Sequence, residues 1–552
     1  MPEHLIPALH QPRLPRESLL LSEAPGADAV EMDAVFVGGG PAGLAGALEL
    51  ERLVREDNAR GGGLGDVSIA VLEKAEALGQ HSLSGAVINP RSFRELFPGM
   101  ADSEFPFRAP VTGERVYMLS ERRALRIPTP PPMKNHGNYI ASLCEVVRWL
   151  GEKAEGRGIN LFTGFPVRSL LTEGARVTGV RTTATGLKRD GRPGPGHQPP
   201  TDIKAKVTAL AEGCRGPLTQ AWLAWQGITS PNPQIYALGV KEIWETKAPL
   251  DAILHTLGWP LAGGAFGGSF CYPLEPRVLA LGLVVGLDAP STALDVHDLL
   301  QRLKTHPLFR PLLAGGEMVE GGAKTIPEGG WWSLPSRRHG DGALVLGDAA
   351  GFVDVGALKG IHYAMKTGIE AGRAIFRALK AGDTSRSTLA SYDHALNGSF
   401  AVTDLEAGRS LRLGFKRGFA RGALTAGLST LTGGALPRAR IAVEEDAAET
   451  KAVEAAAPLR PDGKLTFSKV DGVYKSGNQT RDDIPSHLVV GQDVPAAVAD
   501  LYVSLCPAGV YERRGDSLVV NAPNCVDCKA TDVLGPRWTP REGGSGPKYK
   551  RM

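Results

Sequence analysis

Residues 32–43 read MDAVFVGGGPAG, and this stretch decides the fold. A short apolar run, typical of a buried parallel strand, ends in a glycine-rich turn, and good helix-forming residues continue to Val54. A second apolar run, SIAVL at residues 68–72, is followed by Glu73. The order strand, helix, strand predicts an α/β protein with a Rossmann-like, dinucleotide-binding sheet.

The glycine-rich turn has the spacing G-x-G-x-x-G. Gly38 permits the tight turn, Gly40 lets the backbone approach a pyrophosphate, and Gly43 lets the helix pack closely on the strand. The helix that opens with Pro41 and Ala42 would face the phosphates with unpaired N–H groups. We therefore predict that these five residues bind the cofactor. An ordinary glycine-rich turn is the alternative, and the surrounding strand and helix pattern disfavours it.

An acidic residue follows the second strand. Glu73 is placed to accept hydrogen bonds from the ribose hydroxyls of the adenosine. It lies further along the chain than is usual for this motif, because a glycine-rich loop at residues 61–65 and a long helix intervene.

A second glycine motif favours FAD over NAD. Residues 344–351 read LVLGDAAG, so a short strand ends at Gly347 and Asp348. An aspartate there is suited to a ribityl hydroxyl, although a helix N-cap is the alternative. Gly360 and Ile361 open a later helix whose positive end could stabilise negative charge on a reduced isoalloxazine ring. No second G-x-G-x-x-G follows a strand, so we expect no nicotinamide domain.

The bulk composition limits the remaining possibilities. A chain of 552 residues, 42% hydrophobic and 22% charged, should fold into about two to four domains. No apolar run of about 18 residues exists, so we expect no transmembrane helix. The net charge of +3 does not indicate a nucleic-acid partner. Six cysteines are too few for a disulfide scaffold, which suggests a reducing compartment.

Three of the six cysteines lie close to the C-terminus, at Cys506, Cys525 and Cys528. The last two form a C-x-x-C in the stretch NCVDCKATD, and Thr531 stands where a third cysteine would continue the spacing. Thiolates are the preferred protein ligands of iron–sulfur clusters. The other three cysteines are read as small buried hydrophobic residues.

Several stretches together resemble the electron transfer flavoprotein–ubiquinone oxidoreductase family, over most of the chain from about Asp33 onward. They are VGGGPAG at 37–43, SLSGAVINP at 82–90, MKNHGNYI at 133–140, FGGSFCY at 266–272, CPAGVYE at 506–512, NCVDCK at 524–529 and PREGGSGPKY at 540–549. The last three are the most specific.

The resemblance implies three linked parts. They are a discontinuous FAD-binding domain, an interleaved β-rich quinone-binding domain, and a C-terminal ferredoxin-like iron–sulfur domain. The boundaries we expect are a leader at 1–29, the FAD domain at 30–225 and 335–400, the ubiquinone domain at 226–334, a basic membrane-surface segment and linker at 401–458, and the iron–sulfur domain at 459–552. Within these, we expect a surface loop at the Gly/Pro-rich residues 188–201 and a linker helix at the Ala/Glu-rich residues 444–458.

The implied activity is electron transfer from reduced electron transfer flavoprotein, through an iron–sulfur cluster and FAD, to ubiquinone. No side chain is singled out as catalytic. The resemblance adds Lys74, Ser84 and Gly85 to the residues expected to contact FAD. It also places Phe266, Gly267 and Gly268 at the quinone headgroup, where glycine N–H groups and aromatic walls suit a carbonyl ligand. A glycine-rich strand bend is the alternative for these three residues.

The family pattern ends in four cysteines, and here Thr531 replaces the last one. Cys506, Cys525 and Cys528 are the implied metal ligands. Four outcomes stay open: a [3Fe–4S] cluster on three cysteines, a [4Fe–4S] cluster that takes Asp527, Asp532 or water, a labile cluster that loses one iron, and an empty site. The retained CPAGVY and EGGSGP turns favour a preserved ligand site.

Residues 407–443 carry seven basic residues and no acidic ones. Such a segment suits an anionic membrane surface, and a solvated basic face or a docking site for an acidic protein is the alternative. We expect a peripheral protein on the cytoplasmic face of a bacterial inner membrane, or on the mitochondrial inner membrane if the chain is eukaryotic. Two other functions remain: an FAD-dependent reductase or monooxygenase of the geranylgeranyl-reductase-like group with a degenerate cluster domain, and a non-catalytic electron relay.

Overall fold

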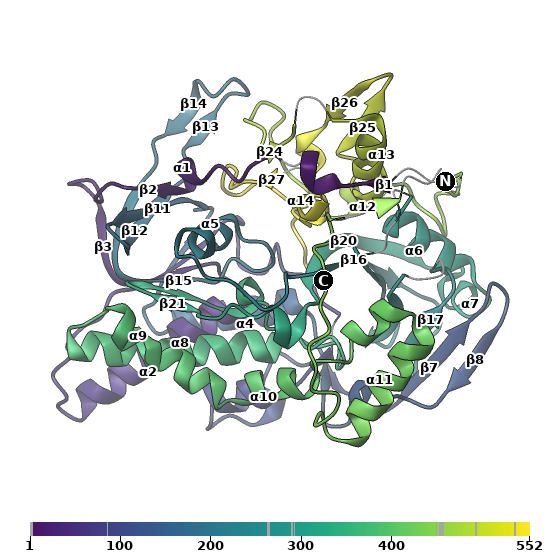
Figure 1. The fold of residues 1–552 in the computed structure, drawn as a ribbon, viewed down its shortest axis with the longest axis horizontal. Coiled ribbons are helices and arrows are strands. Elements are labelled where there is room, and N and C mark those ends of the chain that lie inside the picture. Colours follow the sequence, from purple (N-terminus) through teal and green to yellow (C-terminus); the bar gives the residue numbers. More distant parts are fainter. Residues whose placement is uncertain are drawn as a thin grey trace.

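The computed structural model describes residues 4–10, 12–85, 87–261, 265–288, 291, 293–448, 450–451, 457–491, 494–534 and 537–552. Figure 1 shows one large sheet with long helices beneath it, a second sheet beside it, and C-terminal elements, in yellow, above and between the two. The predicted mixed α/β architecture is confirmed.

The first sheet has nine strands in the order β10-β4-β3-β15-β12-β11-β2, with β22 and β21 continuing from β15. The predicted strand–helix–strand unit is its centre, because β3 and β4 run parallel and α2 connects them. Its strands are β2 (Leu20–Leu21), β3 (Val30–Val37), β4 (Ile69–Glu73), β10 (Asn160–Thr163), β11 (Val167–Glu173), β12 (Arg176–Thr182), β15 (Asp202–Leu210), β21 (His339–Gly340) and β22 (Ala343–Val345).

The second sheet has seven strands in the order β20-β16-β19-β18-β17-β7-β8, antiparallel except for the pair β17 and β7. They are β7 (Glu114–Leu119), β8 (Ala124–Ile127), β16 (Tyr236–Glu245), β17 (Ile253–Gly258), β18 (Gly267–Glu275), β19 (Val278–Gly286) and β20 (Glu317–Pro327). Strands β16 to β20 of this sheet fall within residues 226–334, whereas β7 and β8 come from earlier in the chain.

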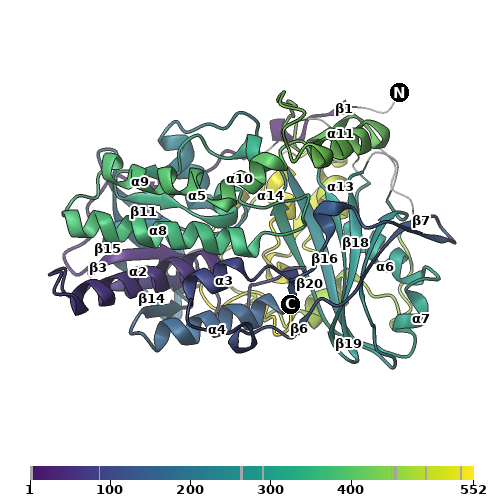
Figure 2. The same cartoon turned by 90° about the horizontal axis from the view of Figure 1, so that it is seen from below.

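The α-helices of the described residues lie around and between these sheets (Figures 1 and 2). Their bounds are α1 (Arg16–Leu19), α2 (Pro41–Ala59), α3 (Arg91–Leu96), α4 (Leu143–Glu155), α5 (Pro217–Trp225), α6 (Val296–Thr305), α7 (Arg310–Leu313), α8 (Ile361–Ala381), α9 (Arg386–Asn397), α10 (Phe400–Ala407), α11 (Phe419–Leu431), α12 (Lys469–Lys475), α13 (Ala496–Leu505) and α14 (Ala530–Leu534).

The C-terminal segment shares a hydrophobic core with the second sheet. Buried Val498 and Leu501 of α13 belong to the same cluster as Leu281 of β19. The Thr325 N–H of β20 donates to the Cys528 carbonyl at 3.0 Å. Small paired strands complete this segment: β24 (Leu488–Val489) with β27 (Arg537–Trp538), and β25 (Tyr511–Arg514) with β26 (Ser517–Val520).

Two local expectations were wrong. Part of residues 188–201 forms strand β14 (Pro193–Gln198), which pairs with β13 (Thr185–Leu187), because the glycines there supply the turns of a hairpin. In residues 444–458, the described positions form no helix and instead include β23 (Thr450–Lys451), which pairs with β1 (His4–Leu5). Residues 449 and 452–456 of that stretch lie outside the described residues.

Helices α2 and α8 pack together with almost no space between their backbones, and Figure 2 shows them side by side. A Cβ atom at Gly368 would lie 2.1 Å from the Ala42 carbonyl oxygen and 2.9 Å from the Gly46 nitrogen. A Cβ atom at Gly372 would lie 2.6 Å from the Gly46 carbonyl oxygen. Glycines in this contact therefore bring the N-termini of the two helices to one place.

We predict that Gly368→Ala destabilises the protein by about 1–3 kcal/mol, because the added methyl group overpacks a contact made by backbone atoms. Thermal unfolding, followed by circular dichroism, measures the effect. The matched control is Gly427→Ala on α11, where a Cβ atom meets nothing within 4 Å and alanine is the better helix former. Equal melting temperatures for Gly368→Ala and the wild type would contradict the prediction.

A candidate two-cofactor redox site

The predicted glycine-rich loop needs glycine at two of its positions for steric reasons. Gly38 has a φ of 121°, and a Cβ atom there would lie 2.2 Å from the Ala211 carbonyl oxygen. A Cβ atom at Gly43 would lie 2.1 Å from the Gly38 carbonyl oxygen. The loop therefore turns tightly between β3 and α2, as the spacing predicts.

The start of α2 is open toward a ligand. Gly40 is the N-cap of α2, makes no side-chain capping hydrogen bond, and has no atom within 4 Å of an added Cβ. The Glu73 carboxylate borders this space, since it accepts hydrogen bonds from the Gly39 N–H at 3.0 Å and the Ala75 N–H at 2.8 Å. An open helix N-terminus beside an acidic side chain fits a diphosphate and its ribose.

Segments far apart in the sequence meet beside this loop. A Cβ atom at Gly347 would lie 3.1 Å from the Cβ of Ala42, and one at Gly360 would lie 3.9 Å from an Asp348 carboxylate oxygen. The N-terminus of α8, at Ile361, thus faces the same region as the N-terminus of α2. Desolvation raises the pKa of Asp348 to about 6. These predicted residues form one cradle, and they fit FAD.

The three remaining residues expected at FAD lie toward other parts of the chain. The Lys74 ammonium forms an ion pair with Asp527 at 2.8 Å. The Ser84 carbonyl accepts a hydrogen bond from Lys241 at 3.0 Å. A Cβ atom at Gly85 would lie 3.8 Å from the Tyr272 ring of the second sheet. Lys74 therefore connects the end of β4 to the cysteine-bearing segment, while Ser84 and Gly85 border the second sheet.

The residues expected at the quinone lie at the start of β18. A Cβ atom at Gly267 would lie 2.2 Å from the Val284 carbonyl oxygen, and one at Gly268 would lie 2.5 Å from the Thr256 carbonyl oxygen. Close packing against β19 and β17 is thus sufficient reason for both glycines. The Phe266 ring lies against Phe415, with centroids 5.4 Å apart, and so joins this strand to the basic segment.

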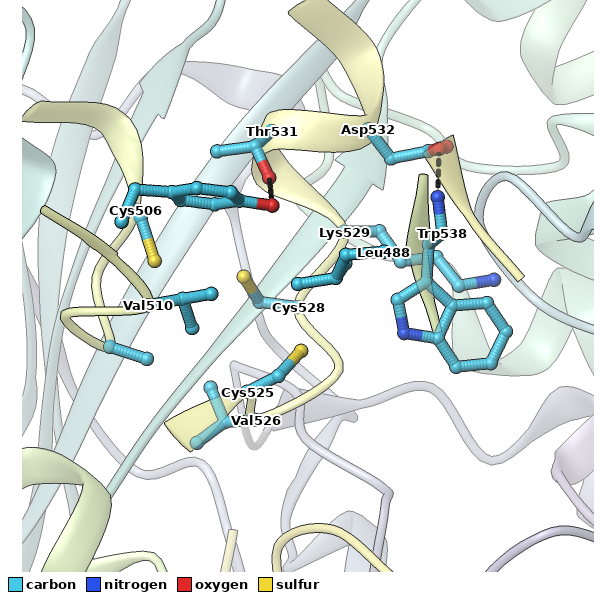
Figure 3. A pocket seen from close by; sticks show the side chains of 12 residues that line it. Leu488, Cys506, Val510, Cys525, Val526, Cys528, Lys529, Thr531, Asp532 and Trp538 are labelled. Atoms are coloured by element: carbon cyan, nitrogen blue, oxygen red, sulfur yellow. Dashed lines mark hydrogen bonds between the residues drawn. The ribbon is translucent and has the colours of Figure 1, made fainter. Parts of the chain in front are cut away.

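Figure 3 shows the three predicted cysteine ligands around one cavity. Cys506 follows α13, whereas Cys525 and Cys528 come from the loop before α14. Their side chains line the cavity together with Tyr511 and Thr531. Burial raises the pKa of the Cys525 thiol to about 12, so thiolates form here only when a cation compensates the charge. The other three cysteines are buried, as expected.

Asp527, between the two loop cysteines, is buried among cations. It pairs with Lys74 at 2.8 Å and with Arg541 at 3.0 Å, and His81 lies at 3.6 Å. Burial alone would raise the pKa of Asp527, but Arg541 and Lys74 hold it well below its usual range. Partly buried Lys324 also interacts electrostatically with Asp527 and the Cys528 thiol. The surroundings are rich in positive charge and suit an anionic thiolate cluster.

Several buried donors beside the cavity have no hydrogen-bond partner. They include Arg541 Nε, Trp538 Nε1 and the N–H of the His487 ring, neither of whose nitrogens has a partner. Ligand atoms of His487, Cys525 and Asp527 lie within 4.8 Å of one another. Unsatisfied buried donors are costly, and the sulfur atoms of a bound cluster would accept from them. The residues present therefore fit an iron–sulfur cluster.

The sequence did not identify Arg541, His81, His487 or Lys324 as parts of this site. They come from four separate segments that only the fold brings together, and of the four only Arg541 lies within a quoted signature, PREGGSGPKY at 540–549. Tyr511 and Asp527 lie within the quoted signatures, close in sequence to Cys506 and Cys525. This proximity was the one signal that could have marked them as part of the site.

Two family models match the chain. One, described as ETF-QO, ubiquinone-binding, matches residues 236–326. The other, described as electron transfer flavoprotein-ubiquinone oxidoreductase, 4Fe-4S, matches residues 463–550. These two matches cover the second sheet and the cysteine-bearing segment.

Solved structures share the fold over about three quarters of the chain. A geranylgeranyl bacteriochlorophyll reductase-like protein from Thermoplasma acidophilum has a TM-score of 0.56 and 18% identity, and the match covers 74% of this chain and 97% of that chain. The flavin-dependent brominase Bmp2 has a TM-score of 0.51 and 18% identity, over 74% of this chain and 94% of that chain. At such identities the likeness concerns the fold alone.

Curated relatives extend over nearly the whole chain. The mitochondrial electron transfer flavoprotein-ubiquinone oxidoreductase of Oryza sativa subsp. japonica is 37% identical over 553 residues, covering 96% of this chain and 94% of the relative. The counterpart in Rattus norvegicus is 36% identical over 560 residues, covering 95% of this chain and 90% of the relative. The chain therefore belongs to the electron transfer flavoprotein–ubiquinone oxidoreductase family.

Proposed function

We propose that this protein is an electron-transferring-flavoprotein dehydrogenase. It takes electrons from reduced electron transfer flavoprotein and passes them through an iron–sulfur cluster and FAD to ubiquinone. The observation that carries the proposal is that one chain combines a dinucleotide cradle with a three-thiol cavity and joins them through the Lys74–Asp527 ion pair. The reductase, monooxygenase and relay alternatives are not favoured, because they do not call for this combination.

FAD supplies a centre that exchanges one or two electrons. Around it, the chain provides an electrostatic frame: the N-termini of α2 and α8 face the cradle and stabilise negative charge. Glu73 and Asp348 are the carboxylates assigned to the ribose and ribityl hydroxyls. The other proposed FAD contacts are Gly38, Gly40, Pro41, Ala42, Gly43, Lys74, Ser84, Gly85, Gly347, Gly360 and Ile361. The proposed quinone contacts are Phe266, Gly267 and Gly268. The proposed metal ligands are Cys506, Cys525 and Cys528.

The proposed division into domains follows the two sheets and the C-terminal segment. The FAD domain takes residues 30–225 and 335–400, and the quinone domain takes residues 226–334. β7 and β8 are an exception to this division, because they belong to the second sheet although they precede residue 225. The iron–sulfur domain takes residues 459–552.

The membrane-facing surface is proposed to be α11 and the chain that follows it. Leu424 and Leu431 are 75% and 87% exposed, and exposed Leu428 lies on the same helical face. Arg421 and Arg438 are exposed nearby. Arg412 does not contribute, because it is buried and pairs with Asp288 and Glu328. Exposed leucines beside arginines suit an interfacial helix.

Among the described residues, no helix combines the length and apolarity needed to cross a bilayer. The named relatives are mitochondrial. We place the protein peripherally on the cytoplasmic face of a bacterial inner membrane, or on the mitochondrial inner membrane if the chain is eukaryotic.

The proposed activity predicts that reduced electron transfer flavoprotein reduces a short-chain ubiquinone only when this protein is present. NADPH should not bleach the flavin, because no nicotinamide site is expected. Absorbance of the quinone and of the flavin measures both reactions. Rapid bleaching by NADPH, or no quinone reduction by the FAD-loaded protein, would contradict the proposal.

The membrane assignment predicts that the double variant Leu424→Asp, Leu431→Asp loses most of its binding to anionic lipid vesicles. Its reduction of a water-soluble quinone should stay near the wild-type rate. Vesicle cosedimentation measures the binding. The double variant Val470→Asp, Tyr474→Asp on α12 is the control, because it places the same two charges at apolar positions that are 58% and 80% exposed. If the double variant on α11 cosediments with the vesicles as well as the wild type does, α11 is not the membrane-binding surface.

Asp348 predicts a pH dependence of stability in protein stripped of FAD. Its raised pKa of about 6 means that folding favours the protonated carboxyl, so its stabilising contribution is complete at low pH. That contribution should decline as the pH rises from about 4, the ordinary value, to about 6. In a plot of melting temperature against pH, Asp348→Asn should remove the decline in this interval. Asp66→Asn, at an exposed position, is the control and should keep the decline. If the melting temperature of Asp348→Asn declines as much as that of the wild type, Asp348 is not the group responsible.

A further inference from the structure

We propose that the iron–sulfur cluster of this protein is a three-iron cluster, [3Fe–4S], held by Cys506, Cys525 and Cys528, with no iron at the corner beside Thr531. The inference rests on the proposed function, since it specifies the cluster of that same site. It departs from the 4Fe-4S description of the family model that matches residues 463–550.

The three thiols are arranged to bind one shared cluster. In Figure 3 their sulfur atoms face one shared space, with Cys506 on one side and the two loop cysteines on the other. Asp527 and Lys529 flank Cys528 with φ angles of 56° and 64°, which is uncommon for residues other than glycine. The Asp527 N–H donates to the Cys525 sulfur at 3.4 Å. Such strained backbone persists where the surroundings fix a site.

The fourth corner is lined by two neutral oxygens. Thr531, on α14, lines the cavity, and its hydroxyl donates to the Tyr511 hydroxyl at 3.3 Å. Both side chains are buried. An alcohol keeps its proton near neutral pH, and a neutral hydroxyl is a poor ligand for iron in a sulfide cluster. Thr531 and Tyr511 therefore close the corner by bonding to each other.

The two neighbouring carboxylates are already engaged. Asp527 pairs with Lys74 at 2.8 Å and Arg541 at 3.0 Å. Asp532 pairs with Arg215 at 2.7 Å and accepts a hydrogen bond from the backbone N–H of Trp538 at 2.6 Å. Binding iron would break these buried, charge-assisted contacts and leave cations without partners. Neither carboxylate is free to replace the missing thiolate.

His487 does not supply the fourth ligand either. Its ring groups with Cys525 and Asp527, with ligand atoms within 4.8 Å. His487 thus lies beside the corner of the cluster that Cys525 already binds. The residues that line the cavity include Thr531 and Tyr511 but not His487.

The surrounding charge is consistent with three thiolates on three irons. An oxidised [3Fe–4S] cluster on three thiolates has the same net charge as an oxidised [4Fe–4S] cluster on four. Lys529 and Arg541, which are buried, and Lys324, which is partly buried, lie near the cavity and therefore stabilise it equally well. A four-iron cluster with a neutral hydroxyl at one corner would carry one negative charge fewer among the same buried cations.

The wild-type holoenzyme, purified without oxygen, tests the proposal by its iron content and low-temperature paramagnetic resonance. We expect about three irons per FAD and a signal in the oxidised state, since an oxidised [3Fe–4S] cluster is paramagnetic. Ferrous iron added under reducing conditions should be lost again on desalting. A stable content of about four irons, silent when oxidised and paramagnetic when reduced, would overturn the proposal. A protein without iron would overturn it as well.

Thr531→Cys tests the corner directly. The variant should gain one iron per FAD, lose the oxidised signal and acquire a reduced one. Tyr511→Phe is the matched control, because it removes the partner of Thr531 without adding a ligand, and its iron content should equal that of the wild type. If Thr531→Cys folds and keeps the wild-type spectrum, position 531 does not border an open corner and the inference fails. If the variant does not fold, the wild-type spectrum decides.

Quinone reduction by electron transfer flavoprotein, measured on the same samples, separates the two proposals. An active protein with four irons rejects the three-iron cluster and retains the function. An inactive protein with three irons and FAD rejects the function and retains the cluster.

Discussion

The buried carboxylate of Asp527 is the constraint on which the arrangement of the two redox sites depends. It is contributed by the cysteine-bearing loop, yet its partners are Lys74 from the end of the nucleotide-binding strand and Arg541 from the following tail segment. Removing one partner of such a buried pair leaves an uncompensated charge, which is strongly destabilising. The ion pairs thus fix the position of the cysteine loop relative to the FAD cradle.

Two further contacts make the structure a single assembly. The glycine contact between α2 and α8 sets two helix N-termini at one cradle. The C-terminal segment buries its apolar residues in the core of the second sheet. The second sheet and the C-terminal segment therefore share one hydrophobic core, the first sheet has a core of its own, and the Lys74–Asp527 ion pair connects the two parts.

Local patterns predicted the tight turn between β3 and α2, because a strand, three glycines and a helix are adjacent in the sequence. The partners of charged residues could not be predicted in this way. Lys74 and Asp527 are separated by 453 positions, and nothing near Lys74 indicates a partner so distant. Arg412 was counted within a basic surface segment, but tertiary packing buries it against two carboxylates. The glycines of β18 were assigned to a ligand, while the structure also gives them a packing reason.

The end of strand β4 and the residue after it connect the two candidate sites. Glu73, the last residue of β4, contacts the glycine-rich loop, and Lys74, in the bend that follows, contacts the cysteine loop. Because these two contacts come from adjacent residues, inserting or deleting one residue here would displace a contact of each site at once.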